Sequence, residues 1–484
     1  MMTEPCDLSA VELRELIGRK ALSPVELLAS CLKRIDAVNP ALNAITATAV
    51  DRAKAEARAA EQAVMMGAPL GPLHGLPIGI KDLNATAGLK TTLGSPLYRD
   101  FVPEADERMV AAVRHAGAIV VGKTNTPEFG AGANTNNPVY GPTGNPFDPA
   151  RICGGSSGGS AVALATSMLP TCTGSDTGGS LRIPAAFCGI VGFRPTPGLV
   201  ASERRPLGWT PLSVQGPMGR NVADTLLLLR AQVSDDARDP LAAPVDAQEF
   251  ATLRPVDLSG VRAAVTEDFG GMLPIDPRIR ATFRERVAII GGAFKSCENR
   301  HPDMRHADEA FSAMRAMNFL AAHKERYEKH RDKLGPNIIA NYEEGLAMSA
   351  ADIARGQVLH TELYRNCLRF FEDVDILISP TVSVPPFPLE QRYCDEIDGR
   401  KLPTYYTWLA PTYFLTLTAN PSISLPSGLE PTGTPFALQL STRPRRDKYL
   451  LDVAAALEAL LQSDPRTARP LPDLEKLKNW KRGR

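Results

Sequence analysis

The chain has 484 residues, of which 44% are apolar and 22% charged, and it carries 54 Lys plus Arg against 54 Asp plus Glu. This composition is ordinary for a globular protein, and the balanced charge gives no electrostatic case for a nucleic-acid partner. No stretch approaches the 18 uninterrupted apolar residues of a membrane span, so we expect no membrane association. The N-terminus has no basic segment before an apolar run, and the eight cysteines are scattered without CxxC pairs. These features predict a cytoplasmic protein with free thiols.

The N-terminal segment 1–69 is predicted to be helical. The letters SPVE from Ser23 form a capping box with Pro at the first helical position, and similar patterns at Ser9 and Thr48 predict two more helix starts. An Ala-rich and charged stretch follows Thr48, which is typical of an amphipathic helix with a solvated face.

Short apolar runs alternate with helical patterns in the next segment, 70–225. The runs LPIGI, AIVV and GIVGF are separated by stretches such as ERMVAAVRHAG and GSAVALATSML. Buried strands that alternate with helices indicate an α/β fold with a largely parallel sheet. Segment 226–373 is mainly helical, and 374–484 returns to the strand-like runs DILISP, SISLP and FALQL before the helical stretch DKYLLDVAAALEALLQ.

The stretch GAIVVGKT, residues 117–124, matches the phosphate-binding pattern G-x-x-x-x-G-K-[ST]. In a true phosphate loop the strand ends before the first Gly, and the loop backbone wraps the phosphates. Here the interior positions are Ala, Ile, Val and Val, which favour a strand, and Pro127 follows three residues beyond the motif. We therefore expect no nucleotide site.

The stretch CGGSSGGS, residues 153–160, contains the pattern G-x-S-x-G at Ser156. In α/β-hydrolases this nucleophilic Ser ends a strand, whereas here the turn-rich NPFDP precedes it. A Ser also needs a base, and spacing alone leaves His74 and His360 open as triad members. His301 and His306 have no further His or Cys close by in sequence, which predicts no metal site.

A second Ser-Gly cluster, GSDTGGSLRIP from residue 174 to 184, follows the first, and Lys81 lies upstream at the end of the apolar run PIGIKD. Lys can deprotonate a Ser if burial keeps its amine neutral. The order LHGLPIGIKD, GAIVVGKTNTPEFG, NPFDPARICGGSSGGSA, GSDTGGSLRIPA and GIVGFRPTPG resembles the amidase signature family. The resemblance covers residues 10 to 460 and is strongest from 70 to 220.

The resemblance implies a division of labour among these residues. Ser180 is then the nucleophile, Lys81 the base, and Ser156, after a cis peptide from Gly155, passes the proton between them. The resemblance also implies an oxyanion hole. In it the backbone amides of Ser180 and of the three residues before it surround the carbonyl oxygen of the substrate; those three are Thr177, Gly178 and Gly179.

Three neighbouring residues are expected to support this site. Asp176 and Arg182 flank Ser180, and we expect them to pair and fix the loop, which we favour over a surface ion pair of little value. Ser157 either shares the relay or satisfies backbone groups, and we assign it a supporting role.

The resemblance also implies the architecture: one amidase domain over 1–484, built on a central mixed, largely parallel twisted sheet of about ten strands with helices on both faces. Within it, 1–69 would be N-terminal helices, 70–225 the signature core, 226–373 a variable region on the substrate side, and 374–484 the C-terminal strands and helix. No cofactor or metal is expected. The oligomeric state is left open, with a homodimer as one option.

The expected activity is hydrolysis of a small amide, with esters and carbamates as further acyl-transfer substrates, as in an acylamidase or a urethanase. Three segments are candidate walls of the substrate pocket: the aromatic cluster at 405–414, the helical stretch 310–345, and the loop with Arg204, Arg205 and Trp209. An apolar pocket of this kind favours substrates with aryl or acyl groups. The alternative is the family's catalytic subunit of a glutamine-dependent tRNA amidotransferase. That subunit carries Ser-Leu-Asp-Gln where this chain has Leu212–Ser213–Val214–Gln215, without the Asp.

Overall fold

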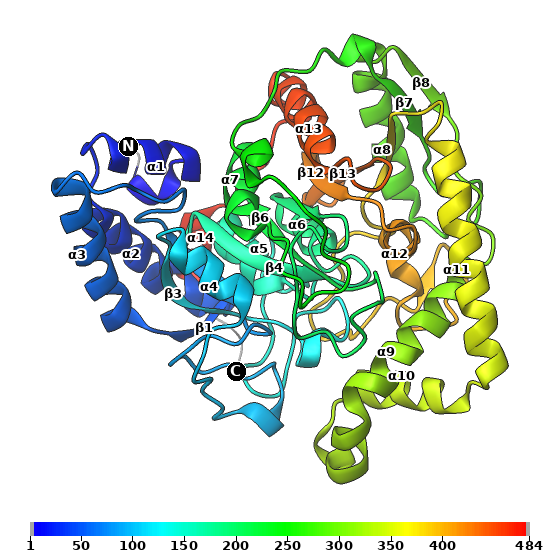
Figure 1. Ribbon diagram of the computed structural model, residues 1–484. Coiled ribbons are helices and arrows are strands. Elements are labelled where there is room, and N and C mark those ends of the chain that lie inside the picture. The colour runs from blue at the N-terminus through cyan, green and yellow to red at the C-terminus, as the bar shows by residue number, and fades with distance from the viewer. Residues whose placement is uncertain (1–3, 481–484) are drawn as a thin grey trace.

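A single large sheet forms the centre of the protein. The computed structural model describes residues 4–480, and its eleven-stranded sheet has the order β1-β3-β2-β4-β6-β5-β12-β13-β9-β7-β8 (Figure 1). The strands are β1 (Ile45–Thr48), β2 (Pro77–Lys81), β3 (Ile119–Thr124), β4 (Thr171–Asp176), β5 (Val191–Arg194), β6 (Val214–Gly219), β7 (Arg262–Val265), β8 (Ser296–Asn299), β9 (Ile376–Pro380), β12 (Ser422–Leu429) and β13 (Pro435–Ser441). A separate small hairpin pairs β10 (Glu396–Ile397) with β11 (Arg400–Lys401).

The sheet is mixed, as predicted. Parallel pairs join β3, β2 and β4 on one side and β9, β7 and β8 on the other. Antiparallel pairs connect these two groups, in the order β4, β6, β5, β12, β13 and β9. The edge pair β1–β3 is antiparallel as well. Parallel pairing is thus less extensive than the sequence patterns suggested, because β12 and β13 form a hairpin in the middle of the sheet.

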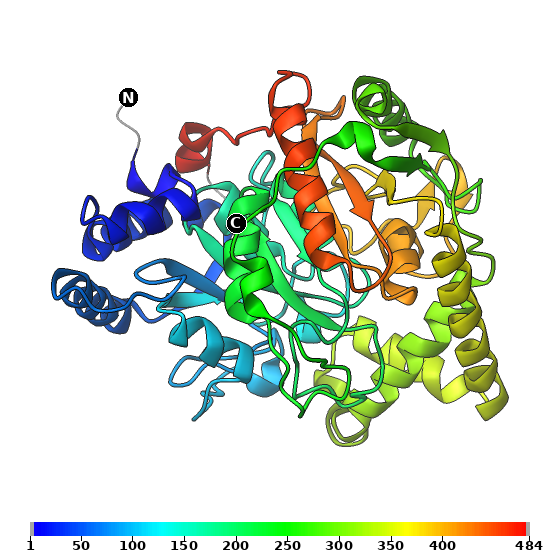
Figure 2. The ribbon, with the colours of Figure 1, turned by 45° about the horizontal axis from the view of Figure 1, so that its top comes forward.

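Helices cover both faces of the sheet. They are α1 (Ala10–Gly18), α2 (Pro24–Leu42), α3 (Val50–Met65), α4 (Arg108–His115), α5 (Gly158–Ala165), α6 (Arg182–Cys188), α7 (Val222–Gln232), α8 (Pro277–Ile290), α9 (Ala307–His330), α10 (Pro336–Ala347), α11 (Ala350–Phe370), α12 (Ala410–Leu417), α13 (Asp447–Gln462) and α14 (Leu474–Asn479). Figure 2 shows α7 and α13 side by side across one face. No described helix combines the length and the apolar character that a bilayer span would require.

The two faces bury separate hydrophobic clusters, and β3 shows why. Its side chains alternate, so that Ile119 and Val121 join the cluster with α2 and α5, whereas Val120 joins the cluster with α4 and α7. β3 is therefore an unbroken, fully buried strand up to Thr124, and the phosphate-loop pattern within it forms no loop.

Local sequence signals explain most helix starts. Ser9 and Ser23 both cap their helices in the predicted capping boxes, with Pro24 at the first position of α2. The helix start predicted at Thr48 is present slightly later, but Thr48 does not cap it: this residue ends β1, and α3 begins at Val50 after an N-terminal cap residue, Ala49, that offers no side-chain hydrogen bond.

Helix α5 fixes the position of the Ser-Gly loop that precedes it. Every residue of α5 is buried, and the chain enters it through Gly158 and Gly159. A Cβ on Gly159 would lie 2.2 Å from the backbone N of Asn125 and 2.5 Å from the backbone O of Ala44. The second half of the Ser-Gly stretch is thus rich in glycine because neighbouring backbone approaches it closely.

We therefore expect Gly159→Ala to destabilise the protein. The added methyl group meets backbone atoms that cannot rotate away, and overpacking of this kind costs about 1–3 kcal/mol. Urea unfolding followed by circular dichroism measures the change. Gly260→Ala is the control, because a Cβ there has no atom within 4 Å; equal midpoints for the two variants would contradict the packing argument.

Candidate active site

Lys81 is the centre of the site. It is the last residue of β2 and is fully buried, and its Nζ lies 2.7 Å from the Oγ of Ser156, 2.8 Å from that of Ser157 and 2.9 Å from that of Ser175. The structure therefore brings the lysine and the first Ser-Gly loop together, as the sequence predicted.

The environment of Lys81 leaves a substantial share of its amine neutral near pH 7. Burial lowers the pKa of Lys81 to about 7, because a desolvated ammonium is unfavourable, and the negative charge of Asp176 opposes this shift only in part. The three direct partners of the amine are neutral hydroxyls that accept hydrogen bonds from it, and a neutral amine has one lone pair with which it can accept a proton from one of them. Lys81 can thus act as a general base at neutral pH.

Ser156 follows a cis peptide bond from Gly155, as the resemblance implied. Gly154, one residue earlier, has a φ of +78°, and a Cβ there would lie 2.8 Å from the Cα of Pro184. The hydroxyl of Thr135 donates to the carbonyl of Gly154 at 2.8 Å and anchors the loop. Ser156 is buried at 2% exposure, so its hydroxyl contacts Lys81 away from bulk water.

Ser180 lies half-buried in the turn between β4 and α6. Gly179 before it has a φ of +127°, and a Cβ there would lie 2.3 Å from the Oγ1 of Thr412. Only glycine fits this position. The carbonyl of Ser180 accepts a hydrogen bond from the Ser157 N–H at 3.2 Å, which ties the two Ser-Gly stretches together.

The predicted oxyanion-hole amides differ in their partners. The N–H of Gly179 donates to Asp176 at 2.8 Å, so in this structure it is directed at a carboxylate. The N–H groups of Thr177, Gly178 and Ser180 have no hydrogen-bond partner among residues 4–480. Three of the four amides are therefore available to a substrate oxygen.

A buried ion cluster supports this turn. Arg182 binds Asp176 with two parallel contacts of 3.0 Å, and the Nη1 of Arg194 lies 3.3 Å from the same carboxylate. All three side chains are fully buried. Burial alone would raise the pKa of Asp176, but the two guanidinium groups hold it far below its usual range. The expected pairing of Asp176 with Arg182 is present, and it is a core ion pair.

Sequence reasoning missed two residues of the site, Ser175 and Arg194. Ser175 reaches Lys81 because it lies two residues after Thr173 on β4, and the Thr173 hydroxyl accepts from the Lys81 backbone N–H at 3.0 Å. The period of two along a strand could have indicated Ser175. Arg194 offered no local signal, because β5 reaches Asp176 only through the fold.

The histidines left open as bases lie elsewhere. The Nε2 of His74 is 3.0 Å from the Ala60 carbonyl oxygen, and that of His360 is 2.7 Å from the Leu417 carbonyl oxygen. Within residues 4–480 no cluster of three metal-ligating side chains occurs.

An aromatic wall lies against the turn before Ser180. A Cβ on Gly178 would be 3.1 Å from the ring of Phe311, and Phe311 stacks on Tyr413 with ring centroids 4.2 Å apart. The helical stretch and the aromatic cluster singled out in the sequence thus meet beside this turn. Trp209 is 80% exposed, and Trp408 is buried in the core against Phe187.

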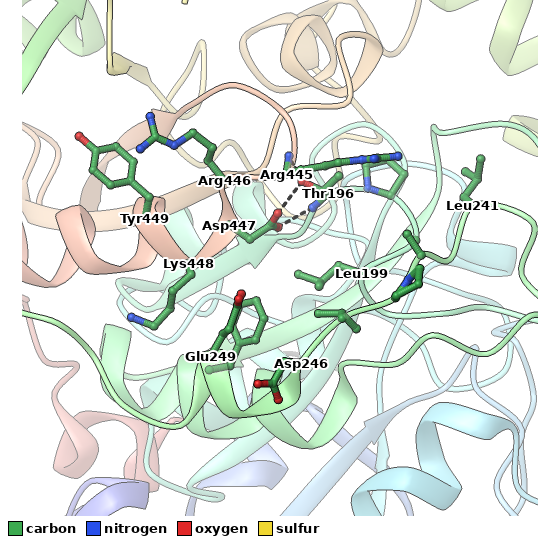
Figure 3. A pocket seen from close by; sticks show the side chains of 16 residues that line it. Thr196, Leu199, Leu241, Asp246, Glu249, Arg445, Arg446, Asp447, Lys448 and Tyr449 are labelled. Atoms are coloured by element: carbon green, nitrogen blue, oxygen red, sulfur yellow. Dashed lines mark hydrogen bonds between the residues drawn. The ribbon is translucent and has the colours of Figure 1, made fainter.

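One cavity of the protein lies away from the predicted site residues and another lies next to them. One of about 410 Å³ lies at the start of α13, where Asp447 accepts hydrogen bonds from the N–H and hydroxyl of Thr196 (Figure 3). None of the predicted site residues lines it. The other, of about 460 Å³, begins beside Ser213, whose Oγ accepts from the Thr177 hydroxyl at 3.1 Å, so this one adjoins the turn before Ser180.

Comparisons with known proteins agree with this geometry. The family model Amidase matches residues 26–451, and the chain belongs to this family of amide-hydrolysing enzymes. It is 32% identical to an acylamidase of Rhodococcus erythropolis, covering 94% of this chain and 95% of that protein. It is 33% identical to a component of the glutamyl-tRNA(Gln) amidotransferase of Chloroflexus aurantiacus, covering 95% of this chain and 98% of that protein. The solved structure of a bacterial aryl acylamidase of the amidase signature family superposes with a TM-score of 0.87 at 27% identity, covering 95% and 96% of the two chains.

The depressed pKa of Lys81 predicts the pH dependence of activity. Below pH 7 the amine carries a proton and cannot take another, so kcat/KM should rise with pH with a midpoint near 7 and then level off. Initial rates from about pH 5 to about pH 11, with circular dichroism to confirm folding at each pH, provide the measurement. A midpoint near the ordinary lysine value of about 10.4 would show that burial does not set this pKa.

The ion cluster predicts a stability effect at Arg194. Arg194→Met removes one of two cations from a buried carboxylate, and losing a partner of a buried pair costs about 3–5 kcal/mol. Because Arg182 still binds Asp176, we expect the lower end of this range in denaturant unfolding. Arg305→Met is the control, since it breaks an exposed pair with Asp303; an equal loss in both variants would exclude a special role for the cluster.

Proposed function

We propose that this enzyme hydrolyses small amides through an acyl-enzyme on Ser180, with Lys81 as the base and Ser156 as the proton relay. The observation that carries the proposal is the contact of 2.7 Å between a fully buried Lys81 Nζ and the Ser156 Oγ. Ser180, rather than Ser156 or Ser157, is assigned as nucleophile because both of those hydroxyls are buried against the lysine, whereas Ser180 is half-buried beside three available N–H groups.

In acylation, the Ser180 Oγ attacks the amide carbonyl carbon while its proton passes to Ser156, and Ser156 gives its own proton to Lys81. The negative oxygen accepts from the amides of Thr177, Gly178 and Ser180. The C–N bond then breaks, and the proton returns through Ser156 to the leaving amine. Water repeats the sequence on the ester, releasing the acid and restoring Ser180.

Gly179 and Ser157 take different parts in this proposal. The Gly179 N–H donates to the Asp176 carboxylate. In this arrangement Gly179 positions the turn and does not bind the substrate oxygen. Ser157 lies almost as close to Lys81 as Ser156 does, and its Oγ is 3.3 Å from the Ser175 carbonyl oxygen. We assign it to orienting the lysine amine, together with Ser175.

The substrate is proposed to be an amide with an aryl or acyl group, and esters and carbamates share the same chemistry. The wall of Phe311 and Tyr413 beside Gly178 supports an apolar group at the carbonyl. Activity on carbamates, as in a urethanase, belongs to this proposal as a substrate to be tried. We further propose one catalytic domain that works in the cytoplasm without a cofactor or a nucleic acid.

The second candidate is the catalytic subunit of a tRNA-dependent amidotransferase. Its support is the Chloroflexus aurantiacus relative, which is as similar to this chain as the acylamidase is. Against it stands Val214, which occupies the position of the Asp in the Ser-Leu-Asp-Gln element of that subunit. The purified chain alone should release amine from an aryl amide, and activity that appears only with partner subunits would favour the second candidate.

The roles of the three residues lead to a graded prediction. Ser180→Ala and Lys81→Ala should abolish hydrolysis of a p-nitroanilide while the proteins stay folded. Ser156→Ala should lose about 10²–10⁴ in rate, the value of general base catalysis, because the nucleophile and the oxyanion donors are kept.

A fluorophosphonate probe identifies the nucleophile directly. Trypsin releases residues 152–182 as one peptide, since cleavage sites follow Arg151 and Arg182, and its fragment ions distinguish the serines. The label should be on Ser180 and form more slowly in Ser156→Ala. A label on Ser156 with Ser180 untouched would reverse the two roles.

A further inference from the structure

The cavity of about 460 Å³ beside Ser213 adjoins the proposed catalytic residues through two of its lining residues. Ser213 contacts Thr177 of the oxyanion turn, and Gln215 pairs directly with Ser175 across β4 and β6. Directly paired residues on antiparallel strands share one face of the sheet, and the Ser175 hydroxyl contacts Lys81. A substrate whose carbonyl reaches Ser180 can therefore extend into this cavity.

The cavity has an apolar wall and a charged wall. The lining residues are Leu83, Ala85, Thr91, Leu93, Tyr98, Phe101, Glu107, Ser202, Arg204, Arg205, Pro206, Ser213, Gln215 and Arg326. Phe101 is 45% exposed, which is unusual for such a large apolar side chain at a cavity and suits an apolar ligand body.

The charges on the cavity wall are not balanced. Arg205 is neutralised, since it pairs with Asp239. Glu107 is buried and accepts from Asn84 at 2.6 Å and from the Ala85 N–H at 3.1 Å; burial raises its pKa, whereas these two hydrogen bonds and the positive charge of Arg204 oppose that shift. Arg204 and Arg326 form no ion pair within residues 4–480.

Arg326 is held in place without a carboxylate. Its guanidinium carbon lies 5.5 Å from the ring centre of Tyr98 and 4.8 Å from that of Phe129, and its Nε and Nη2 donate to the Tyr98 hydroxyl at 3.2 and 3.1 Å. Stacking on two rings and a hydrogen bond from its Nη1 to the Ala322 carbonyl orient the cation at the cavity; its charge acts on the neighbouring Glu325, but no carboxylate contacts it directly. Arg204, on the loop after Ser202, is exposed and in no direct ion pair within residues 4–480, although its charge also acts on Glu107.

We propose that this cavity selects amide substrates that carry a carboxylate at the end remote from the scissile bond, with Arg326 and Arg204 as its partners. The proposal rests on the proposed amide hydrolysis and adds a substrate class to it. Guanidinium groups recognise carboxylates through charge-assisted hydrogen bonds, and the apolar wall accommodates the chain or ring between the two ends.

The experiment compares matched substrates that differ only in charge. Glutaryl-p-nitroanilide against butyryl-p-nitroanilide places the carboxylate on the acyl side, and N-acetyl-4-aminobenzoate against N-acetyl-4-toluidine places it on the amine side. We expect kcat/KM of wild type to favour the charged member of at least one pair, which also identifies the side of the scissile bond that occupies the cavity.

Variants then assign the preference to the two arginines. Arg204→Gln combined with Arg326→Gln should reduce kcat/KM for the charged member by about 10- to 100-fold, as expected for lost hydrogen bonds to a charged group, and change the neutral member little. Lys329→Gln is the matched control, because this exposed lysine is on the same helix, pairs with Glu325 and does not line the cavity. It should leave both members unchanged.

Arg204→Gln alone keeps the test valid if loss of the stacked Arg326 harms folding, since Arg204 is exposed. It should weaken competitive inhibition by glutarate or benzoate, whichever matches the preferred pair, and 0.5 M NaCl should weaken that inhibition in wild type. Equal rates within both pairs, or variants that slow charged and neutral members equally, would overturn the inference while amide hydrolysis stands. No hydrolysis of any of the four amides by wild type would instead overturn the proposed function.

Discussion

The rest of the site depends on keeping one lysine amine out of water. Removing Lys81 from solvent lowers its pKa to about 7, and this is possible only because β2 ends inside the sheet, between β3 and β4. The partners then have to be short and neutral, since a carboxylate in contact would restore the charge. Three serine hydroxyls meet this requirement, and glycines around them allow two loops to approach the same atom.

A second buried lysine, Lys123, shows how a nearby carboxylate changes the charge of a buried amine. Lys123 on β3, inside the stretch that resembles a phosphate loop, is also fully buried, but its Nζ lies 4.0 Å from Asp82 and contacts the hydroxyls of Thr86 and Thr91. Burial lowers its pKa to about 8, with Asp82 opposing the shift, while burial raises the pKa of Asp82 to about 6. At pH 7 these two groups are charged and paired, so Lys123 joins β3 to the loop after Lys81 and is the poorer base of the two.

The sequence was most informative where one element carries its own signal. Capping boxes gave α1 and α2, apolar runs gave the strands, and DKYLLDVAAALEALLQ matches α13 residue for residue. At Thr48 the capping residue was misplaced, because Thr48 pairs with β3 as the end of β1 and the helix starts at Val50. The antiparallel pairs from β4 to β9 came only from the fold, because strands buried on both faces read as unbroken apolar runs whichever way their neighbours point. Lys81 and Ser156 were found through motifs, whereas Arg194 and the cavity walls come from segments that only the fold brings together.

The turn before Ser180 holds a buried carboxylate and also presents free amides. The Asp176 carboxylate accepts from the Gly179 and Leu181 N–H groups at 2.8 and 3.2 Å, which turns those two amides inward. The amides of Gly178 and Ser180, which alternate with them, have no hydrogen-bond partner among residues 4–480 and stay available to a substrate oxygen. A carboxylate in this position would repel a developing oxyanion, but Arg182 and Arg194 neutralise it. Within the buried ion cluster, Asp176 therefore orders the turn through its two amide contacts. Arg182 and Arg194 neutralise the negative charge that Asp176 brings to the site.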